Sequence, residues 1–143
     1  MLPNLDVRPK GIIRNYMGHG CAIIIAHNSG AYIEECLHAL CDHAGWDIVL
    51  LDNASSDNTL ARARKFRDRV RIIANNQNRG FSGAVNHCVN STNSSVVVVL
   101  NPDAVAMSGA LDRLAAAIEN PSVGAAGGML VGRDGTPQLG FIF

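Results

Sequence analysis

The sequence predicts an α/β domain, in which a mostly parallel sheet is flanked by helices, and three observations support this. Short β-branched runs, such as 21–26 and 96–100, alternate with segments whose apolar residues recur about every 3.6 positions. Strands that alternate with helices favour a parallel sheet wrapped by those helices. The 143 residues suffice for one domain with its own core. We therefore expect one domain over residues 20–143, preceded by an extension over residues 1–19.

Four strands and four helices are expected in alternation along the chain. The expected strands lie at residues 21–26, 47–51, 70–74 and 96–100. The expected helices lie from about residue 31 to 43, around residues 60–66, from about residue 80 to 87, and from residue 108 to 120. Because the fourth strand contains four consecutive valines, we expect it to be buried.

Polar residues at the predicted helix starts are candidate caps. Asn28 and Ser29 precede the first helix, where a side-chain oxygen can accept from free backbone N–H groups. Asp57 has the same place before the second helix, and Ser108 before the fourth. The pair Asn120-Pro121 is expected to end that last helix, because a residue before proline disfavours the helical conformation.

Composition excludes several classes of protein. Twelve basic and twelve acidic residues give a formal net charge of zero, so no overall field favours nucleic acid. No apolar run approaches the roughly 20 residues that span a bilayer, and no signal peptide is apparent, so we expect a cytoplasmic location. Half of the basic residues lie between Arg62 and Arg71. A solvated helix face is the favoured interpretation of this run, and peripheral contact with the inner face of a membrane is the alternative.

The four cysteines fit reduced thiols better than a disulfide scaffold or a zinc site. None forms a C-x-x-C pair, although His38 and His43 lie near Cys36 and Cys41. Because these two thiols are five positions apart on a predicted helix, they point in different directions. Both complete the apolar stripe of that helix, so we expect them to pack in the core as small hydrophobic residues.

Polar residues follow all four predicted strands, at the edge where open α/β sheets bind their ligands. The candidates are, in chain order, His27, Asn28, Asp52, Asn53, Asn78, Arg79, Asn101 and Asp103. Carboxylates on two strand ends, together with amides and a guanidinium, suit a ligand that has a hydrogen-bonding base, ribose hydroxyls and a metal-bound diphosphate. A nucleotide sugar fits that description, so the sequence predicts a nucleotide-sugar site at this edge.

The two carboxylates of this edge have different expected roles. Asp103 follows Pro102 on a tight loop, and such a carboxylate is the usual ligand of Mg²⁺ or Mn²⁺ that bridges phosphates. A turn without any ligand is the alternative for this tripeptide. At Asp52 a ligand contact is favoured over helix capping, because Ser55 and Asp57 already supply caps.

Other motifs for nucleotides and catalysis are missing or weak. The sequence has no G-x-x-x-x-G-K-[ST], and Gly18-His19-Gly20 precedes the first strand with Ile23 where a third glycine belongs. No Ser-His-Asp arrangement and no metalloenzyme spacing of the histidines can be defended. The start of the third helix at 80–83 offers backbone donors to phosphate, which by itself is a weak signal.

In combination, the motifs resemble those of family 2 glycosyltransferases, especially the rhamnosyltransferase-like branch. The resemblance covers roughly residues 20–140 and rests on four segments in order, which are His27-Asn28-Ser29, Leu51 to Asp57, Asn78 to Phe81, and Leu100 to Asp103. It implies the Rossmann-like GT-A fold of nucleotide-diphospho-sugar transferases. His27 stands where the family more often has Tyr, and Asn101 replaces the first Asp of the D-x-D element. The second departure is common in the rhamnosyl-like branch and puts the choice of sugar in doubt.

The resemblance implies a role for each matching residue. Asp52 would contact the nucleotide base or the ribose, and Asn78 and Arg79 would lie near the diphosphate. Asn86 would support the cleft. Asp103 would be the metal-binding member of the D-x-D element.

We therefore expect the donor-binding part of an inverting glycosyltransferase. It would use Mg²⁺ or Mn²⁺ and a UDP- or dTDP-linked sugar, with rhamnose as a candidate, in bacterial polysaccharide or cell-wall glycan synthesis. Family members continue into a segment that supplies the acceptor site and a carboxylate base. That base is expected beyond Phe143, and the chain is expected to be truncated before the acceptor part, so it would bind donor and transfer sugar poorly.

Partners and alternatives follow from the same reasoning. The acceptor would be a glycan or a lipid-linked molecule, no nucleic acid is expected, and the apolar end at 141–143 favours a homo-oligomer. A non-catalytic nucleotide-binding or assembly module is the alternative function. A nucleotidyltransferase is disfavoured, because no Lys or Arg occurs in the loop that follows the first strand.

Overall fold

The chain divides into two compact units, residues 1–108 and residues 109–143. The structure is a computed structural model that describes residues 20–138. In the first unit, strands and helices alternate as the apolar pattern predicts. Its elements are β1 (Gly20–Ala26), α1 (Ile33–Cys41), β2 (Trp46–Asp52), α2 (Thr59–Ala63), the 3-10 turn η1 (Arg64–Phe66), β3 (Val70–Ala74), α3 (Gly80–Asn90) and β4 (Val97–Leu100).

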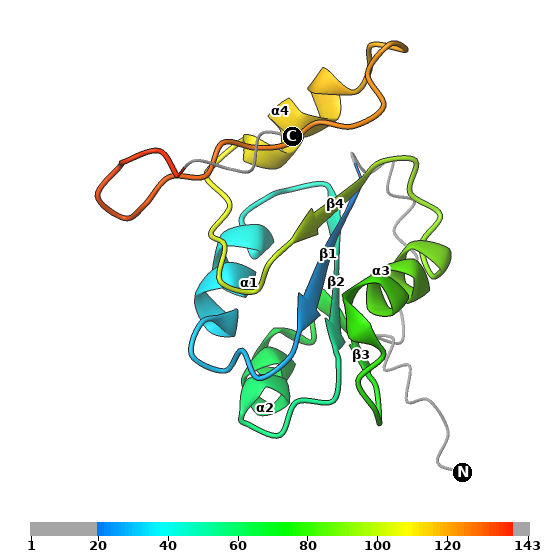
Figure 1. Cartoon of the computed structure of the whole chain (residues 1–143), viewed down its shortest axis with the longest axis vertical. Coiled ribbons are helices and arrows are strands. Elements are labelled where there is room, and N and C mark those ends of the chain that lie inside the picture. Colours follow the sequence, from blue (N-terminus) through cyan, green and yellow to red (C-terminus); the bar gives the residue numbers. More distant parts are fainter. Residues whose placement is uncertain (1–19, 139–143) are drawn as a thin grey trace. The chain divides into compact units, whose positions relative to one another are not determined.

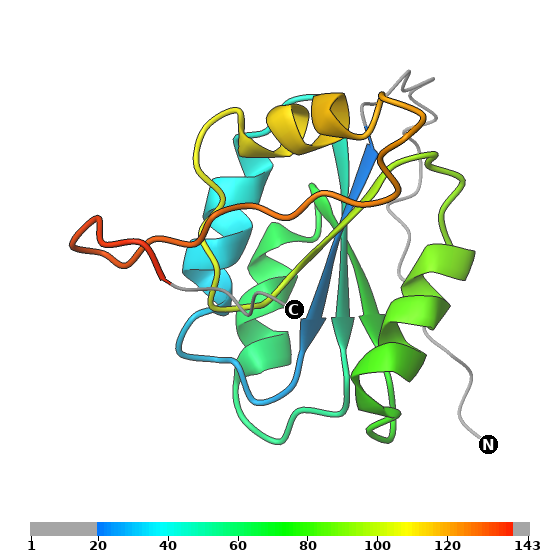
Figure 2. The ribbon, with the colours of Figure 1, turned by 45° about the horizontal axis from the view of Figure 1, so that its top comes forward.

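The four strands form one parallel sheet in the order β3-β2-β1-β4 (Figure 1). Figure 2 shows α1 and α2 on one face of this sheet and α3 on the other. Parallel neighbours need a crossover connection, and helices supply it here. The predicted α/β class, with a parallel sheet flanked by helices, is confirmed.

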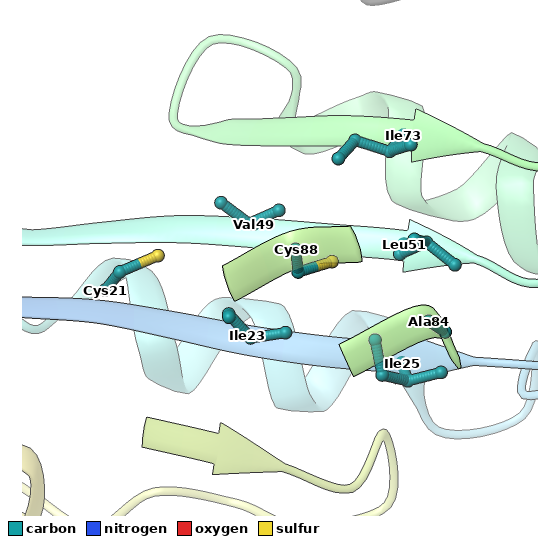
Figure 3. Close-up of a cluster of buried hydrophobic side chains, with 8 residues drawn as sticks. All are labelled: Cys21, Ile23, Ile25, Val49, Leu51, Ile73, Ala84 and Cys88. Atoms are coloured by element: carbon teal, nitrogen blue, oxygen red, sulfur yellow. The ribbon is translucent and has the colours of Figure 1, made fainter. Parts of the chain in front are cut away.

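The face of the sheet toward α3 is built from every second residue of the central strands. The cluster comprises Cys21, Ile23, Ile25, Val49, Leu51 and Ile73 of the sheet with Ala84 and Cys88 of α3 (Figure 3). Alternate residues of the same strands, such as Ile24 and Leu50, are buried on the opposite face. On that side, α1 contributes Ile33, Leu37 and Leu40 to the core. With both faces covered, β1 is buried throughout.

The prediction that the fourth strand is buried is wrong. Among the described strands β4 pairs with β1 alone, and Val99 is 41% exposed. An edge strand has a neighbour on one side only. The valine run therefore predicted the strand correctly, but it did not reveal that the strand lies at the edge.

At the start of α1, a backbone carbonyl accepts from the N–H groups that the predicted side-chain caps were expected to bond. The carbonyl of Ser29 accepts from the N–H groups of Tyr32 and Ile33, each at 3.0 Å, and no side chain caps the helix. Asn28 turns its side-chain oxygen toward Ser56 of the next loop instead. The predicted capping by Asn28 and Ser29 is therefore wrong, because both side chains have other partners.

The other two predicted caps are not the cap residues of their helices either. Asp57 accepts from the backbone N–H of Thr59 at 2.9 Å, but the cap position of α2 is Asn58, and no side chain caps that helix. In the second unit, the cap position of α4 (Ala110–Ala117) is Gly109 with φ 69° and not Ser108. A left-handed residue at this point suits glycine, which has no Cβ to clash.

The basic run between Arg62 and Arg71 is tied into the first unit. Lys65 donates to Glu34 of α1, which lowers the pKa of that carboxyl, and Arg62 Nη1 lies 3.9 Å from its second oxygen. Arg69 and Arg71 donate to oxygens at the ends of α1 and α3. These contacts support the interpretation as a solvated, internally paired surface. No helix in the described range has the length and apolar character needed to cross a membrane.

The four thiols are free, and Cys21, Cys36 and Cys88 are buried. Burial raises the pKa of Cys36 and that of Cys88 to about 12. Within residues 20–138, no three His, Cys, Asp or Glu side chains are placed to hold a metal ion, so the zinc alternative receives no support. Core packing of Cys36 is confirmed, whereas Cys41 is half-buried.

We expect iodoacetamide to modify Cys41 first in the folded protein, and Cys21, Cys36 and Cys88 only after unfolding. The thiolate is the reactive form, and burial removes both access and that form. Alkylation at about pH 8, followed by mass spectrometry of peptides, measures each cysteine, with urea-unfolded protein as the control. Equal labelling of all four thiols in the folded protein would contradict the described core.

Candidate functional site

The carboxyl ends of β1, β2 and β3 lie level with one another. Their last residues, Ala26, Asp52 and Ala74, are register partners across the sheet. The ladder continues one step, since Asn53 N–H donates to the Ala26 carbonyl at 2.7 Å and Asn75 N–H to the Asp52 carbonyl at 2.9 Å. The polar residues that follow these three strands therefore start from one edge of the sheet.

The loops after β1 and β2 interlock through polar contacts. Asn28 N–H donates to Ser55 Oγ at 2.9 Å, and Asn28 Oδ1 accepts from the N–H of Ser56 at 2.8 Å. Each loop turns through a left-handed residue, Asn28 with φ 51° and Ala54 with φ 62°. Asn tolerates this conformation, whereas Ala adopts it rarely. The contacts between the loops are what hold the backbone there.

The same two loops approach closely at Gly30. Gly30 N–H donates to Asp57 Oδ2 at 2.9 Å, and the preceding Ser29 N–H donates to Thr59 Oγ1 at 2.7 Å. A methyl carbon on Gly30 would lie 2.0 Å from Asn58 Oδ1 and 2.9 Å from Asp57 Oδ2. Hydrogen bonds to Thr59 and Gly30 lower the pKa of Asp57, so this carboxylate stays charged where it joins the loops.

Asp52 is 2% exposed at the end of β2. Its two carboxylate oxygens accept from the hydroxyl and, at 3.3 Å, from the backbone N–H of Ser55. Burying a charged group is costly unless it is hydrogen-bonded, and Ser55 supplies those bonds. Asp52 is therefore held by its own loop, and does not act as a helix cap.

Asn53 lies at the junction of the loops after the three strands, and its side-chain amide is fully bonded. Its Oδ1 accepts from Asn75 Nδ2 at 3.1 Å and from Arg79 N–H at 3.0 Å. Its Nδ2 donates to Asn78 Oδ1 at 2.8 Å and to the Gly80 carbonyl at 3.2 Å. The residue is 3% exposed. Asn53 thus joins β2 to the loop after β3 and to the start of α3.

His27 is exposed and is oriented by the same residue. Its Nδ1 lies 3.0 Å from the Asn53 carbonyl oxygen. A carbonyl oxygen only accepts, so we assign the hydrogen to Nδ1. Nε2 is then an acceptor in the neutral ring and a donor in the charged one.

The loop before α3 presents Asn78 and Arg79, both with exposed side chains. Asn78 Oδ1 accepts from the N–H of Gly80 at 2.8 Å, so this amide also closes the first turn of the helix. Two backbone donors at the start of α3, those of Arg79 and Gly80, are therefore already bonded within the protein. The exposed Arg79 side chain, rather than these two N–H groups, remains available as a donor to a ligand.

The end of β4 contributes Asn101 and Asp103, both exposed. The Asn101 carbonyl accepts from Ala104 N–H at 3.1 Å, which forms the predicted turn. Cys36 Sγ of α1 lies 3.8 Å from the Asn101 carbonyl oxygen, so this turn lies beside that helix, and after burial the charge of Asp103 also raises the pKa of Cys36. An exposed carboxylate on a tight turn remains available to a cation.

The structure gathers the predicted residues from β1, β2 and β3 into one bonded edge, and places the β4 pair at the end of the neighbouring strand. Two residues that were not among the candidate ligands, Ser55 and Asn75, complete its hydrogen bonds. The signal that could have revealed Asn75 is its place directly after a buried strand, where an amide needs a partner.

Comparison with known proteins shows a family match along most of the chain. The model of the glycosyl transferase family 2 matches residues 21–140. The chain is 32% identical over 103 residues to the uncharacterized protein MT1568 of Mycobacterium tuberculosis, a match that covers 70% of this chain and 32% of that protein. It is 30% identical over 98 residues to the succinoglycan biosynthesis protein ExoU of Rhizobium meliloti, covering 66% of this chain and 29% of ExoU. The chain thus spans about a third of the length of these relatives.

Solved structures with the same fold include a mannosyltransferase of Pyrobaculum calidifontis in complex with GDP-mannose and Mn²⁺. The two superpose with a TM-score of 0.62 at 23% identity, over 73% of this chain and 32% of that enzyme. At 23% identity, this similarity shows that the two proteins share a fold and shows nothing further. The predicted Rossmann-like GT-A fold is confirmed.

We expect Gly30→Ala to destabilise the protein by about 1 kcal/mol, the low end of the usual effect of overpacking. The added methyl group would displace the exposed Asn58 side chain and weaken the hydrogen bond from Gly30 N–H to Asp57 Oδ2. Urea unfolding measures the change. Gly83→Ala is the matched control, because its Cβ would meet only Arg79 Cβ at an ordinary 3.5 Å and alanine favours the helix. If both variants were equally stable, the close approach at Gly30 would be wrong.

Proposed function

This chain belongs to glycosyl transferase family 2, and from this premise we propose that the carboxyl edge of its sheet binds the nucleoside diphosphate of a sugar donor. The observation that carries the proposal is the contrast between bonded and exposed groups at that edge. The amide of Asn53 is used within the protein, whereas His27, Arg79 and Asp103 are exposed. Ligands of parallel α/β sheets bind beyond this edge, and these three groups suit a base, a diphosphate and a metal ion.

Each candidate has a role that its surroundings allow. The Arg79 guanidinium can bind diphosphate oxygens in a bidentate manner, with Asn78 beside it. His27 offers Nε2 to an N–H of the base. Asp52 is as buried as Asn53, at 2% exposed, and both of its oxygens are bonded to Ser55, so its contact with the base or ribose requires the Ser55 loop to move aside.

The metal in this proposal is Mg²⁺ or Mn²⁺, held by Asp103. Such ions are often held by one or two protein carboxylates together with substrate phosphates and water. The donor set suits that pattern, because Asp103 is an exposed carboxylate that follows the end of β4. The ion would offset the charge that develops on the departing nucleoside diphosphate. Asn101 would contact the donor beside it.

The reaction we propose for the whole enzyme is sugar transfer with inversion, for which a carboxylate base takes the proton of the acceptor hydroxyl. A UDP- or dTDP-linked donor and the rhamnosyltransferase-like branch are the finer parts of the proposal. The branch is supported by Asn101 in place of the first Asp of a D-x-D element, a departure that leaves the sugar of the donor open. We assign no residue of the described edge as the base.

The proposed setting is the synthesis of a polysaccharide or cell-wall glycan. The relative ExoU is named for succinoglycan biosynthesis, and it is 30% identical over 98 residues. The acceptor would be a glycan or a lipid-linked molecule. A non-catalytic nucleotide-binding module is the second candidate, since Arg79 and Asp103 would serve binding without transfer.

We expect calorimetric titration to detect binding of UDP or dTDP that depends on Mn²⁺, and we expect Asp103→Ala to weaken it about tenfold or more, equivalent to about 1.4 kcal/mol or more. Asp134→Ala is the control, because this carboxylate accepts from Thr136 in the second unit. Mn²⁺ alone should bind weakly, because one carboxylate without phosphate makes a poor site.

The outcomes separate the alternatives. Nucleotide binding with hydrolysis or transfer of the sugar supports the enzyme, and binding without any turnover in the full-length protein supports the module. If the folded wild-type chain bound neither nucleotide with Mn²⁺ present, the proposed site would be wrong.

A further inference from the structure

We infer that Asn53 is a positioning residue of this site, whose amide sets the start of α3, and with it Asn78 and Arg79, without touching the donor. The inference rests on the proposed function and deepens it. The sequence pattern groups Asn53 with the residues that contact donor. Its surroundings instead point to an indirect role.

The Asn53 amide has no bonding capacity left for a ligand. An Asn side chain has two N–H donors and two lone pairs on its oxygen. All four are engaged, by Asn75, Arg79, Asn78 and Gly80, at 2.8 to 3.2 Å. With 3% of its surface exposed, the side chain offers almost no face to a bound molecule.

Three consecutive residues, 78–80, are each bonded to this one amide. They contain the turn into α3, where Gly80 adopts φ 72°, a left-handed conformation that glycine takes without steric cost. Arg79 N–H is held by Asn53 Oδ1, so the direction in which the Arg79 side chain leaves the backbone depends on that bond. A guanidinium binds phosphate well only when its planar fork is correctly aimed.

The backbone of Asn53 also positions groups at the end of β1. Its carbonyl lies 3.0 Å from His27 Nδ1 and its N–H donates to the Ala26 carbonyl. One residue therefore sets the relative positions of an imidazole after β1 and a guanidinium after β3. Substrate-positioning residues act in this way, because small displacements of a binding group weaken binding and slow reaction.

Asn53→Asp tests the inference with almost no change of shape. The new oxygen replaces Nδ2 and faces two acceptors, Asn78 Oδ1 and the Gly80 carbonyl. The bonds from Asn75 and Arg79 to the other oxygen are retained. We expect the affinity for UDP or dTDP with Mn²⁺ to fall tenfold or more, in calorimetric titrations at the same pH.

Two control variants separate positioning from charge and from stability. Asn76→Asp adds the same charge to the exposed part of the same loop, outside the bonded amides, and should change affinity less than threefold. Leu37→Ala removes a buried side chain of α1 and should lower stability in urea while affinity is kept. A merely structural Asn53 would behave like Leu37.

A second variant covers the case in which Asn53→Asp does not fold. Asn75 donates to Asn53 Oδ1 and is not among the proposed ligands of the donor. Asn75→Asp places an oxygen against that acceptor, so we expect a smaller loss of affinity in the same direction. Unchanged affinity in this variant would count against transmission through Asn53.

Limited proteolysis measures the order of the 78–80 turn directly, without any ligand. We expect trypsin to cleave after Arg79 at least threefold faster in folded Asn53→Asp than in wild type, with cleavage after Arg133 unchanged. If wild type binds no nucleotide but this acceleration occurs, the proposed function fails and the ordering role of Asn53 stands. If wild type binds, and folded Asn53→Asp binds equally and is cleaved no faster, the inference is overturned.

Discussion

The register of three parallel strands determines where every polar group of the carboxyl edge begins. Ala26, Asp52 and Ala74 are partners across β1, β2 and β3, so the residues that follow them start level. A slip of one residue would turn the buried side chains of a strand to the other face, and the core against α1 and α3 forbids this. The same apolar residues that fix the core therefore also fix the edge.

Once these polar residues start level, they must bond to one another. Asp52, Asn53 and Asn75 are each less than a tenth exposed, and a buried polar group without a partner costs about 1–3 kcal/mol. The loops meet this requirement by close approach, at Gly30, and by two left-handed residues, Asn28 and Ala54. The result is a platform whose shape is fixed before any ligand arrives, which favours binding of a defined ligand.

The sequence predicted the parts of this structure that depend on local pattern. Runs of β-branched residues located β1 and β3, and their ends located the polar residues of the carboxyl edge. It failed where partners come from distant residues. Asn28 bonds to Ser56, 28 positions away, and no local rule distinguishes that partner from a helix end. The edge place of β4 likewise depends on strand order, which the valine run does not contain.

The two exposed charges at this edge explain why binding of a diphosphate would need a metal ion. Arg79 and Asp103 carry opposite charges, so together they give little net attraction for a diphosphate. Asp103 alone would repel it. A divalent cation between this carboxylate and the phosphates converts that repulsion into two attractive contacts, whereas the guanidinium binds directly. Binding that needed no metal ion would therefore leave Asp103 without a physical reason to lie beside the donor.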